Sequence, residues 1–253
     1  MYKPTASVEL STQAMPQIRL LLLGRPGTGK TFSVCTTFPG IIVADFDNGL
    51  TSADIRKLGI LSMPFYDMDW IKKNFPNSGD RAASAFKAWL NNEARKLEKD
   101  QTLFIDSLSA LDDSFHIETE KLAPAGKSGE RDGFFVWNQK QVFFRDIHNI
   151  FKALKCNVVV AAHEKEERDA DSGALLGKVS PLMTGVFASK LGSQYTDVVR
   201  TFSKEERDAA GKPTGKTIYQ WQVKSDDKYD LKSRMTHASK FVEPGYGIFQ
   251  KGY

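Results

Sequence analysis

Eight consecutive residues, Gly24 to Thr31, combine the residue types with which a polypeptide holds a chain of phosphates. They read Gly-Arg-Pro-Gly-Thr-Gly-Lys-Thr, so a lysine and a threonine follow a glycine-rich turn. Glycines allow backbone angles that a Cβ would forbid, and successive N–H groups can then turn inward on an anion. Lys30 would reach the β- and γ-phosphates of a nucleotide, and the Thr31 hydroxyl would hold Mg²⁺. The predicted chemistry is binding of a nucleoside triphosphate with magnesium.

The residues on either side of this turn fit the strand and the helix that must position it. Ile18 to Leu23 is a continuous apolar run, which is typical of a strand buried in a parallel sheet. A helix beginning near Gly29 would point the positive end of its dipole at the anion. The arrangement is the P-loop or Walker A pattern, and a glycine-rich turn that matches by chance is the disfavoured alternative. The predicted nucleotide-binding residues are Gly24, Arg25, Pro26, Gly27, Thr28, Gly29, Lys30, Thr31 and Phe32.

Two further apolar runs end in acidic residues. Ile41 to Phe46 leads into Asp47, and Thr102 to Ile105 leads into Asp106. Sheets of the α/β class bind ligands at the carboxyl ends of their strands. We therefore predict that Asp106 is the Walker B carboxylate, which holds Mg²⁺ through water opposite Thr31, and that Asp47 faces the same ligand. The alternative for Asp47 is a structural role in a turn, because turns favour Asp, Asn and Gly. The alternative for Asp106 is a chance match, because apolar strands often end in Asp.

A fourth predicted strand, Asn157 to Ala162, ends in His163 and Glu164. A lone histidine is usually structural. At the tip of a central strand beside a P-loop, sensing of the γ-phosphate is an equally good interpretation of His163.

The remaining pattern predicts one α/β domain of residues 17–234, preceded by a flexible arm (1–16) and followed by a tail (235–253) with a short helix at most. Alternating strands and helices predict a mostly parallel sheet with helices on both faces. Helices are expected over 80–98, capped by Ser78 or Asp80, and over 108–122 and 135–154, whereas 51–78 is mixed. Strands at 197–202 and 217–223, joined by a polar turn, would form an antiparallel edge, and 164–177 fits a hairpin.

Composition excludes some classes of protein. The 253 residues carry a formal net charge of +4, which is no strong nucleic-acid signature. Cys35 and Cys156 fall in or beside predicted core elements and are interpreted as buried thiols of a reducing compartment. There is no N-terminal apolar signal region, and no apolar run approaches 18 residues, so we expect a cytoplasmic protein without a membrane partner.

The position of the acidic residues distinguishes between classes of P-loop protein. An AAA+ motor usually has Asp-Glu at Walker B, whereas Ser107 follows Asp106 here, and the candidate base is Asp47 at the end of the second strand. This layout resembles the RecA-like recombination ATPases, and it looks closest to short phage-encoded RecA-like proteins of the Sak type, which assist single-strand annealing. The resemblance rests on Gly24 to Thr31, Asp45 to Leu50, Ile105 to Leu111, Val158 to Glu164, and Lys232-Ser233-Arg234.

The resemblance implies an ATPase with a RecA-like core that forms rings or filaments on single-stranded DNA, with ATP and Mg²⁺ between subunits and, as a further partner, a single-strand-binding protein. Lys232 and Arg234 would reach the γ-phosphate of the neighbouring subunit, the alternative being an exposed basic pair. The predicted catalytic residues are thus Lys30, Asp47, His163, Lys232 and Arg234, and the predicted metal ligands are Thr31 and Asp106. The family usually has Glu where Asp47 stands, so slow hydrolysis is expected.

Two loops, 122–134 and 164–195, correspond to those that face DNA in the family. Their basic residues are Lys127, Arg131, Lys165, Arg168, Lys178 and Lys190, accompanied by nearly as many acids. Two other functions stay open. One is a nucleotide-gated assembly or partner-binding module with little hydrolysis, and the other, ranked low, is a small-molecule kinase.

Overall fold

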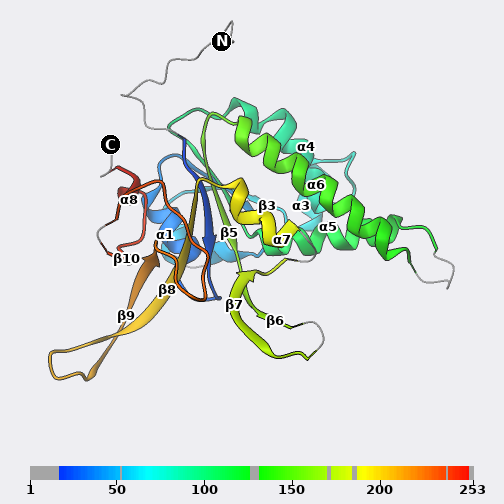
Figure 1. Ribbon diagram of the computed structural model, residues 1–253. Coiled ribbons are helices and arrows are strands. Elements are labelled where there is room, and N and C mark those ends of the chain that lie inside the picture. Colours follow the sequence, from blue (N-terminus) through cyan, green and yellow to red (C-terminus); the bar gives the residue numbers. More distant parts are fainter. Residues whose placement is uncertain are drawn as a thin grey trace, which may run out of the picture.

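The computed structural model describes residues 17–51, 53–125, 131–169, 172–183, 187–237 and 239–250 (Figure 1). The predicted arm, residues 1–16, lies outside these ranges, as does Lys127. The strands are β1 (Arg19–Leu23), β2 (Ile41–Asp45), β3 (Leu61–Pro64), β4 (Thr102–Asp106), β5 (Asn157–Ala162), β6 (Glu164–Arg168), β7 (Leu175–Pro181), β8 (Asp197–Arg207), β9 (Pro213–Gln222) and β10 (Phe241–Val242). The helices are α1 (Lys30–Thr37), α2 (Ala53–Arg56), α3 (Met68–Asn74), α4 (Ala82–Asn92), α5 (Leu108–Leu122), α6 (Gly133–Ala153), α7 (Phe187–Lys190) and α8 (Gly247–Gln250).

Eight of these strands form one sheet in the order β10-β9-β8-β1-β5-β4-β2-β3. The six strands from β8 to β3 run parallel, and β9 and β10 add an antiparallel edge. This arrangement confirms the predicted fold class. In Figure 1, α4, α5 and α6 lie on one side of the sheet and α1 and α8 on the other.

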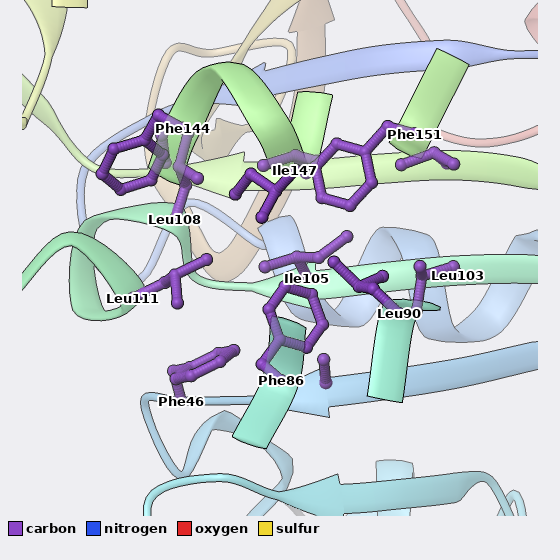
Figure 2. Close-up of a cluster of buried hydrophobic side chains, with 14 of the residues drawn as sticks. Phe46, Phe86, Leu90, Leu103, Ile105, Leu108, Leu111, Phe144, Ile147 and Phe151 are labelled. Carbon is purple, nitrogen blue, oxygen red and sulfur yellow. The ribbon is translucent and has the colours of Figure 1, made fainter. Parts of the chain in front are cut away.

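Side chains that alternate along the central strands build one hydrophobic core on each face of the sheet. Leu21 and Leu23 of β1 belong to the core under α4, α5 and α6, whereas Leu20 and Leu22 belong to the core under α1, α2 and α8. Figure 2 shows side chains of the first core, with Leu103 and Ile105 of β4 beside Phe86 and Leu90 of α4. Complete burial of such a side chain contributes about 1.5–3 kcal/mol. These two layers explain why the central strands are continuous apolar runs.

The register of the parallel strands brings the carboxyl ends of β1, β2, β4 and β5 to the same end of the sheet. Leu23 pairs with Ala162, so Gly24 lies beside His163, and the Gly24 amide donates to the Ala162 carbonyl (3.2 Å). Asp45 pairs with Asp106, and the amides of Phe46 and Asp47 both donate to the Asp106 carbonyl. The glycine-rich turn and both acidic strand ends therefore meet at this end.

One prediction for the edges of the sheet was wrong. Residues 51–78 are mixed, as expected, and contain α2, α3 and the four-residue edge strand β3. The polar link between residues 205 and 216 was expected to be a turn throughout, but β8 and β9 continue into it as a long hairpin and only residues 208–212 form the turn. Both faces of this arm are solvated beyond the sheet (Figure 1), so it has no apolar alternation to detect. The hairpin expected within 164–177 is confirmed as β6–β7, although Asp171 is outside the described residues.

The helix expected at 80–98 is shorter than predicted, because α4 ends at Asn92 and a separate 3₁₀ turn follows over Ala94–Lys96. Neither Ser78 nor Asp80 caps it. Glu118 of α5 instead accepts hydrogen bonds from the amides of Ala83 (2.6 Å) and Ser84 (3.2 Å). The cap therefore comes from another helix, where local sequence carries no signal for it.

The C-terminal residues pack against α1. The Tyr246 amide donates to Thr37 Oγ1 (3.1 Å), Tyr246 meets Phe38 edge-on at 5.3 Å between ring centroids, and Phe249 is buried. This segment contains a short strand, β10, besides the single expected short helix, α8. Cys35 and Cys156 are buried free thiols, as predicted. Among the helices of the described residues, none has both the length and the apolar character that crossing a bilayer requires.

His148 on α6 makes stability depend on pH. Its Nδ1 lies 2.7 Å from the Phe144 carbonyl, which can only accept, so Nδ1 carries the proton and Nε2 accepts from the Tyr195 hydroxyl (2.9 Å). Burial lowers the pKa of His148 to about 4, below the ordinary value of about 6.5. The unfolded chain therefore binds more protons between these pH values, and we expect stability to fall by about 3 kcal/mol as pH drops through this window.

Chemical denaturation of wild type and His148→Gln between pH 7 and 4 measures this effect. The variant should show a shallower dependence on pH, since the buried titrating group is gone. His116→Gln, which removes an exposed histidine from α5, should follow wild type. Parallel curves for wild type and His148→Gln would contradict the prediction.

Candidate active site

The glycine-rich turn forms the cup that its sequence predicted. Gly29 has φ of 82°, in the left-handed region that favours glycine, and α1 begins at the next residue. Gly24 is required for a different reason from the expected one, because a Cβ there would lie 2.0 Å from Thr201 Oγ1 of β8. Lys30 is buried, and its Nζ donates to the carbonyls of Gly24 (2.8 Å) and Arg25 (3.0 Å). The lysine is thus held against the turn.

Thr31 and Asp106 meet as a metal-binding pair would. Thr31 Oγ1 donates to Asp106 Oδ2 (2.7 Å), and Gly49 leaves space beside them that a Cβ would fill, at 2.7 Å from the same carboxylate oxygen. Burial, together with the nearby carboxylates of Asp47 and Asp45, raises the pKa of Asp106 to about 6, although the Thr31 hydrogen bond and the Lys30 charge act in the opposite direction. A bound cation would offset the desolvation of this carboxylate and favour its charged form. The pair therefore fits Mg²⁺.

The turn after β2 separates its two acidic residues into two roles. Asp45 is buried and accepts a hydrogen bond from the Gly49 amide (3.1 Å), while Asn48 adopts φ of 56°. Asp45 therefore stabilises the turn, which is the structural role given above as the alternative for acidic residues here. Asp47 instead lines the cavity.

His163 and Asp47 are hydrogen-bonded to each other. His163 Nε2 lies 3.1 Å from Asp47 Oδ2, and because a carboxylate only accepts, Nε2 is the donor. Burial raises the pKa of Asp47, but the hydrogen bonds from His163 and Ser107 and the positive charge of Lys30 outweigh this, so the pKa is lowered overall. Asp47 is therefore charged at neutral pH and held in place by His163.

Lys30, the Thr31–Asp106 pair and the Asp47–His163 pair line one cavity of about 740 Å³. It is lined by Pro26, Gly27, Gly29, Lys30, Thr31, Phe32, Asp47, Gly49, Asp54, Ile55, Asp106, His163 and Tyr219. Within the described part of the chain, no cluster of three or more histidine, cysteine or acidic residues could enclose a metal ion. A magnesium ion would accordingly rest on Thr31, on Asp106 through water, and on nucleotide oxygens.

A comparison with protein families identifies the domain. A family model described as an AAA domain, AAA_24, matches residues 16–235. The chain belongs to this family. Membership supports the expected class of P-loop nucleotide-binding domain, although Ser107 stands where AAA+ motors usually have the Walker B glutamate. A search of curated proteins finds no match.

Solved structures that resemble this chain include three proteins of low sequence identity. One is a prototypical ATPase from the type III secretion system of pathogenic bacteria (9% identity, TM-score 0.40, covering 72% of this chain and 50% of that one). The others are the RadB recombinase (11%, 0.39, 81% and 87%) and the flagellar accessory protein FlaH from Methanocaldococcus jannaschii (13%, 0.43, 92% and 89%). The chain described here spans about half the length of the secretion ATPase.

Two of the predicted nucleotide-binding side chains of this AAA-domain protein face away from the cavity. Thr28 Oγ1 lies 2.6 Å from Thr201 Oγ1. Arg25 forms ion pairs with Glu164 and Glu166 of β6, both at 3.3 Å. These two side chains hold the turn from outside.

Sequence reasoning missed the residue that anchors this outer side. The Glu164 side chain is only 2% exposed. Arg200 of β8 donates two hydrogen bonds to its carboxylate, from Nε to Oε2 (3.0 Å) and from Nη2 to Oε1 (3.2 Å). The Arg200 guanidinium in turn lies 4.1 Å from the centre of the Tyr229 ring. In the sequence, Glu164 was marked only by its position directly after His163, at the tip of a strand.

Lys232 and Arg234 lie away from the cavity of their own chain. Lys232 pairs through its backbone with Val198 of β8, and its side chain is exposed. Arg234 Nε lies 3.4 Å from the buried carboxylate of Asp197, at the start of β8 and hence at the opposite end of the strands from the cup. Any contact with a γ-phosphate requires another subunit.

The basic residues of the two loops make mostly local contacts. Arg131 donates to the Ala123 carbonyl (2.7 Å), Lys165 to that of Met183 (2.8 Å) and Arg168 to that of Gly173 (3.1 Å). Lys178 and Lys190 are exposed. The described residues of these loops thus offer few uncommitted cations.

Proposed function

We propose that this protein is an Mg-ATP-dependent ATPase that assembles into oligomers and acts on single-stranded DNA in recombination or annealing. The observation that carries the ATPase part is the shared cavity, where Lys30, Thr31, Asp106 and the Asp47–His163 pair converge. The DNA and assembly parts rest on the sequence resemblance to RecA-like and Sak-type proteins.

In this proposal the turn and Lys30 bind the triphosphate, and Thr31 and Asp106 would hold Mg²⁺, which neutralises charge on the phosphate oxygens. Asp47 accepts a proton from a water molecule while the oxygen of that water bonds to the γ-phosphorus. The bond between the γ-phosphorus and the β–γ bridging oxygen breaks at the same time. The products are ADP and inorganic phosphate. His163 positions the Asp47 carboxylate through its Nε2–H.

The chemistry of Asp47 also supports a second function. A carboxylate whose pKa is lowered is a weak base, and Asp47 is one methylene shorter than the glutamate expected there. A nucleotide-gated assembly or partner-binding module with little hydrolysis is therefore the alternative.

Two measurements separate these functions. ATP hydrolysis is measured with and without single-stranded DNA, and oligomeric state is measured by gel filtration with and without ATP. Stimulation of hydrolysis by DNA supports the recombination ATPase. Assembly driven by ATP with negligible turnover supports the module, and a monomer indifferent to DNA contradicts both.

The trans role is best tested at Lys232, because removal of Arg234 would also leave the buried Asp197 carboxylate without its guanidinium. Lys232→Ala should leave ATP affinity unchanged and lower turnover of the assembled protein at least about tenfold, since a charge that stabilises the transferring phosphoryl group is lost. Lys228→Ala, an exposed lysine of the same segment, is the matched control. Equal turnover in Lys232→Ala and Lys228→Ala assemblies would rule out the role.

A further inference from the structure

A second cavity, of about 520 Å³, adjoins the phosphate cavity along α1. The two share three wall residues, Gly29, Phe32 and Tyr219. The second cavity is further lined by Ser33, Thr36 and Thr37 of α1, Ile218 and Gln220 of β9, and Glu243 and Pro244 after β10. Three segments far apart in sequence thus form a compartment that begins where the phosphate cup ends.

Two exposed aromatic side chains stand at the boundary between the cavities. Tyr219 is 38% exposed and Phe32 is 44% exposed, although both are large apolar rings. The Tyr219 ring packs over Gly29, where a Cβ would lie 2.7 Å from Cδ1 and 3.1 Å from Cε1. A flat ring is therefore fixed directly beside the residue that opens the phosphate-binding helix.

The far wall of the compartment is held in place by the docked C-terminal segment. Gly245, with φ of 129°, approaches Thr37 so closely that a Cβ would lie 2.8 Å from its side chain. The Tyr246 hydrogen bond to Thr37 and the Tyr246–Phe38 ring contact fix the same segment to α1. Glu243 and Pro244 are thereby kept at the rim, where the Glu243 carboxylate offers only acceptors.

We propose that this compartment is a nucleobase subsite, in which a purine stacks on Tyr219 with Phe32 beside it. The inference rests on the proposed function, because a base is joined to its phosphates by one sugar and must lie next to the cup that holds them. The volume lies within the range typical of small-molecule sites. Aromatic faces stack on any base and most strongly on the larger purines, and Glu243 accepts from the amino group that adenine carries.

The subsite makes the β8–β9 hairpin and the C-terminal segment part of nucleotide recognition. The P-loop residues by themselves contact phosphates, which all nucleoside triphosphates share. Discrimination between bases therefore falls to Tyr219 and the rim.

Calorimetric titration with ATP and with inorganic tripolyphosphate tests the subsite. Tyr219→Ala should weaken ATP binding roughly 10- to 100-fold and leave tripolyphosphate affinity within about twofold, because only ATP has a base to stack. Tyr219→Phe, which keeps the ring, should recover most of the lost ATP affinity. Wild type should prefer ATP to UTP, and Tyr219→Ala should lose most of this preference.

The outcomes distinguish the two proposals. Unchanged ATP affinity in Tyr219→Ala overturns the subsite while the ATPase proposal stands, and so does an equal loss for ATP and tripolyphosphate, which would mean that the ring only supports Gly29. Failure of wild type to bind either ligand overturns both proposals. A thermal melt of each variant confirms that it is folded.

Discussion

Lys30→Ala is expected to weaken ATP binding about 1000-fold and to abolish measurable hydrolysis. An ammonium group that reaches two phosphates makes two charge-assisted hydrogen bonds of roughly 1.5–3 kcal/mol each, and both are lost. The lysine is already in position, since its Nζ is bound to the carbonyls of Gly24 and Arg25. Alanine also removes the positive charge that offsets Asp106, Asp47 and Glu164, so a triphosphate would meet uncompensated acids.

Isothermal titration with Mg-ATP and a phosphate-release assay measure this loss. Lys96→Ala, which removes an exposed lysine paired with Glu93, is the control for a change of one charge. Because Lys30 also ties down the turn, a thermal melt must show that the variant is folded. Undiminished hydrolysis in folded Lys30→Ala would refute the assignment of the cup.

Asp47→Asn is expected to lower turnover roughly 10²- to 10⁴-fold with little change in ATP affinity, which is the range for loss of a general base. Asparagine keeps the shape and still accepts a hydrogen bond from His163, but it cannot take a proton from water. Asp47→Glu restores the longer side chain expected from the resemblance and should hydrolyse ATP at least as fast as wild type.

Single-turnover hydrolysis on saturated protein separates this chemical step from binding. Asp100→Asn, an exposed carboxylate away from the cavity, controls for the loss of one negative charge. If Asp47→Asn turns over at the wild-type rate, Asp47 is not the base and the nucleotide-gated module becomes the better interpretation. If ATP affinity falls in parallel with turnover, the residue acts in binding.

Much of the site was predictable because its signals are local. The order of glycines, Lys30 and Thr31 depends on backbone angles and side-chain reach within eight residues. The acidic ends of two strands needed one more step, since the carboxyl ends of parallel strands share an edge, and the pairing of Asp45 with Asp106 confirms that they meet.

Other features left no local trace. The cap of α4 comes from Glu118, the hold on Arg25 comes from Glu164 and Arg200, and β3 is too short and too exposed for periodicity to reveal. The β8–β9 arm has no buried face beyond the sheet, so its residues resemble a polar turn.

By itself, the sequence determined the glycine-rich turn, the two apolar layers and the acids at the strand ends, because each depends on residues close together or on a regular alternation. Only the tertiary structure decided that His163 holds Asp47, that Glu164 braces the turn from outside, and that Tyr219 and the C-terminal segment close a compartment beside Gly29. Those contacts join residues between 116 and 209 positions apart, and chain folding, rather than any local pattern, brings such residues together.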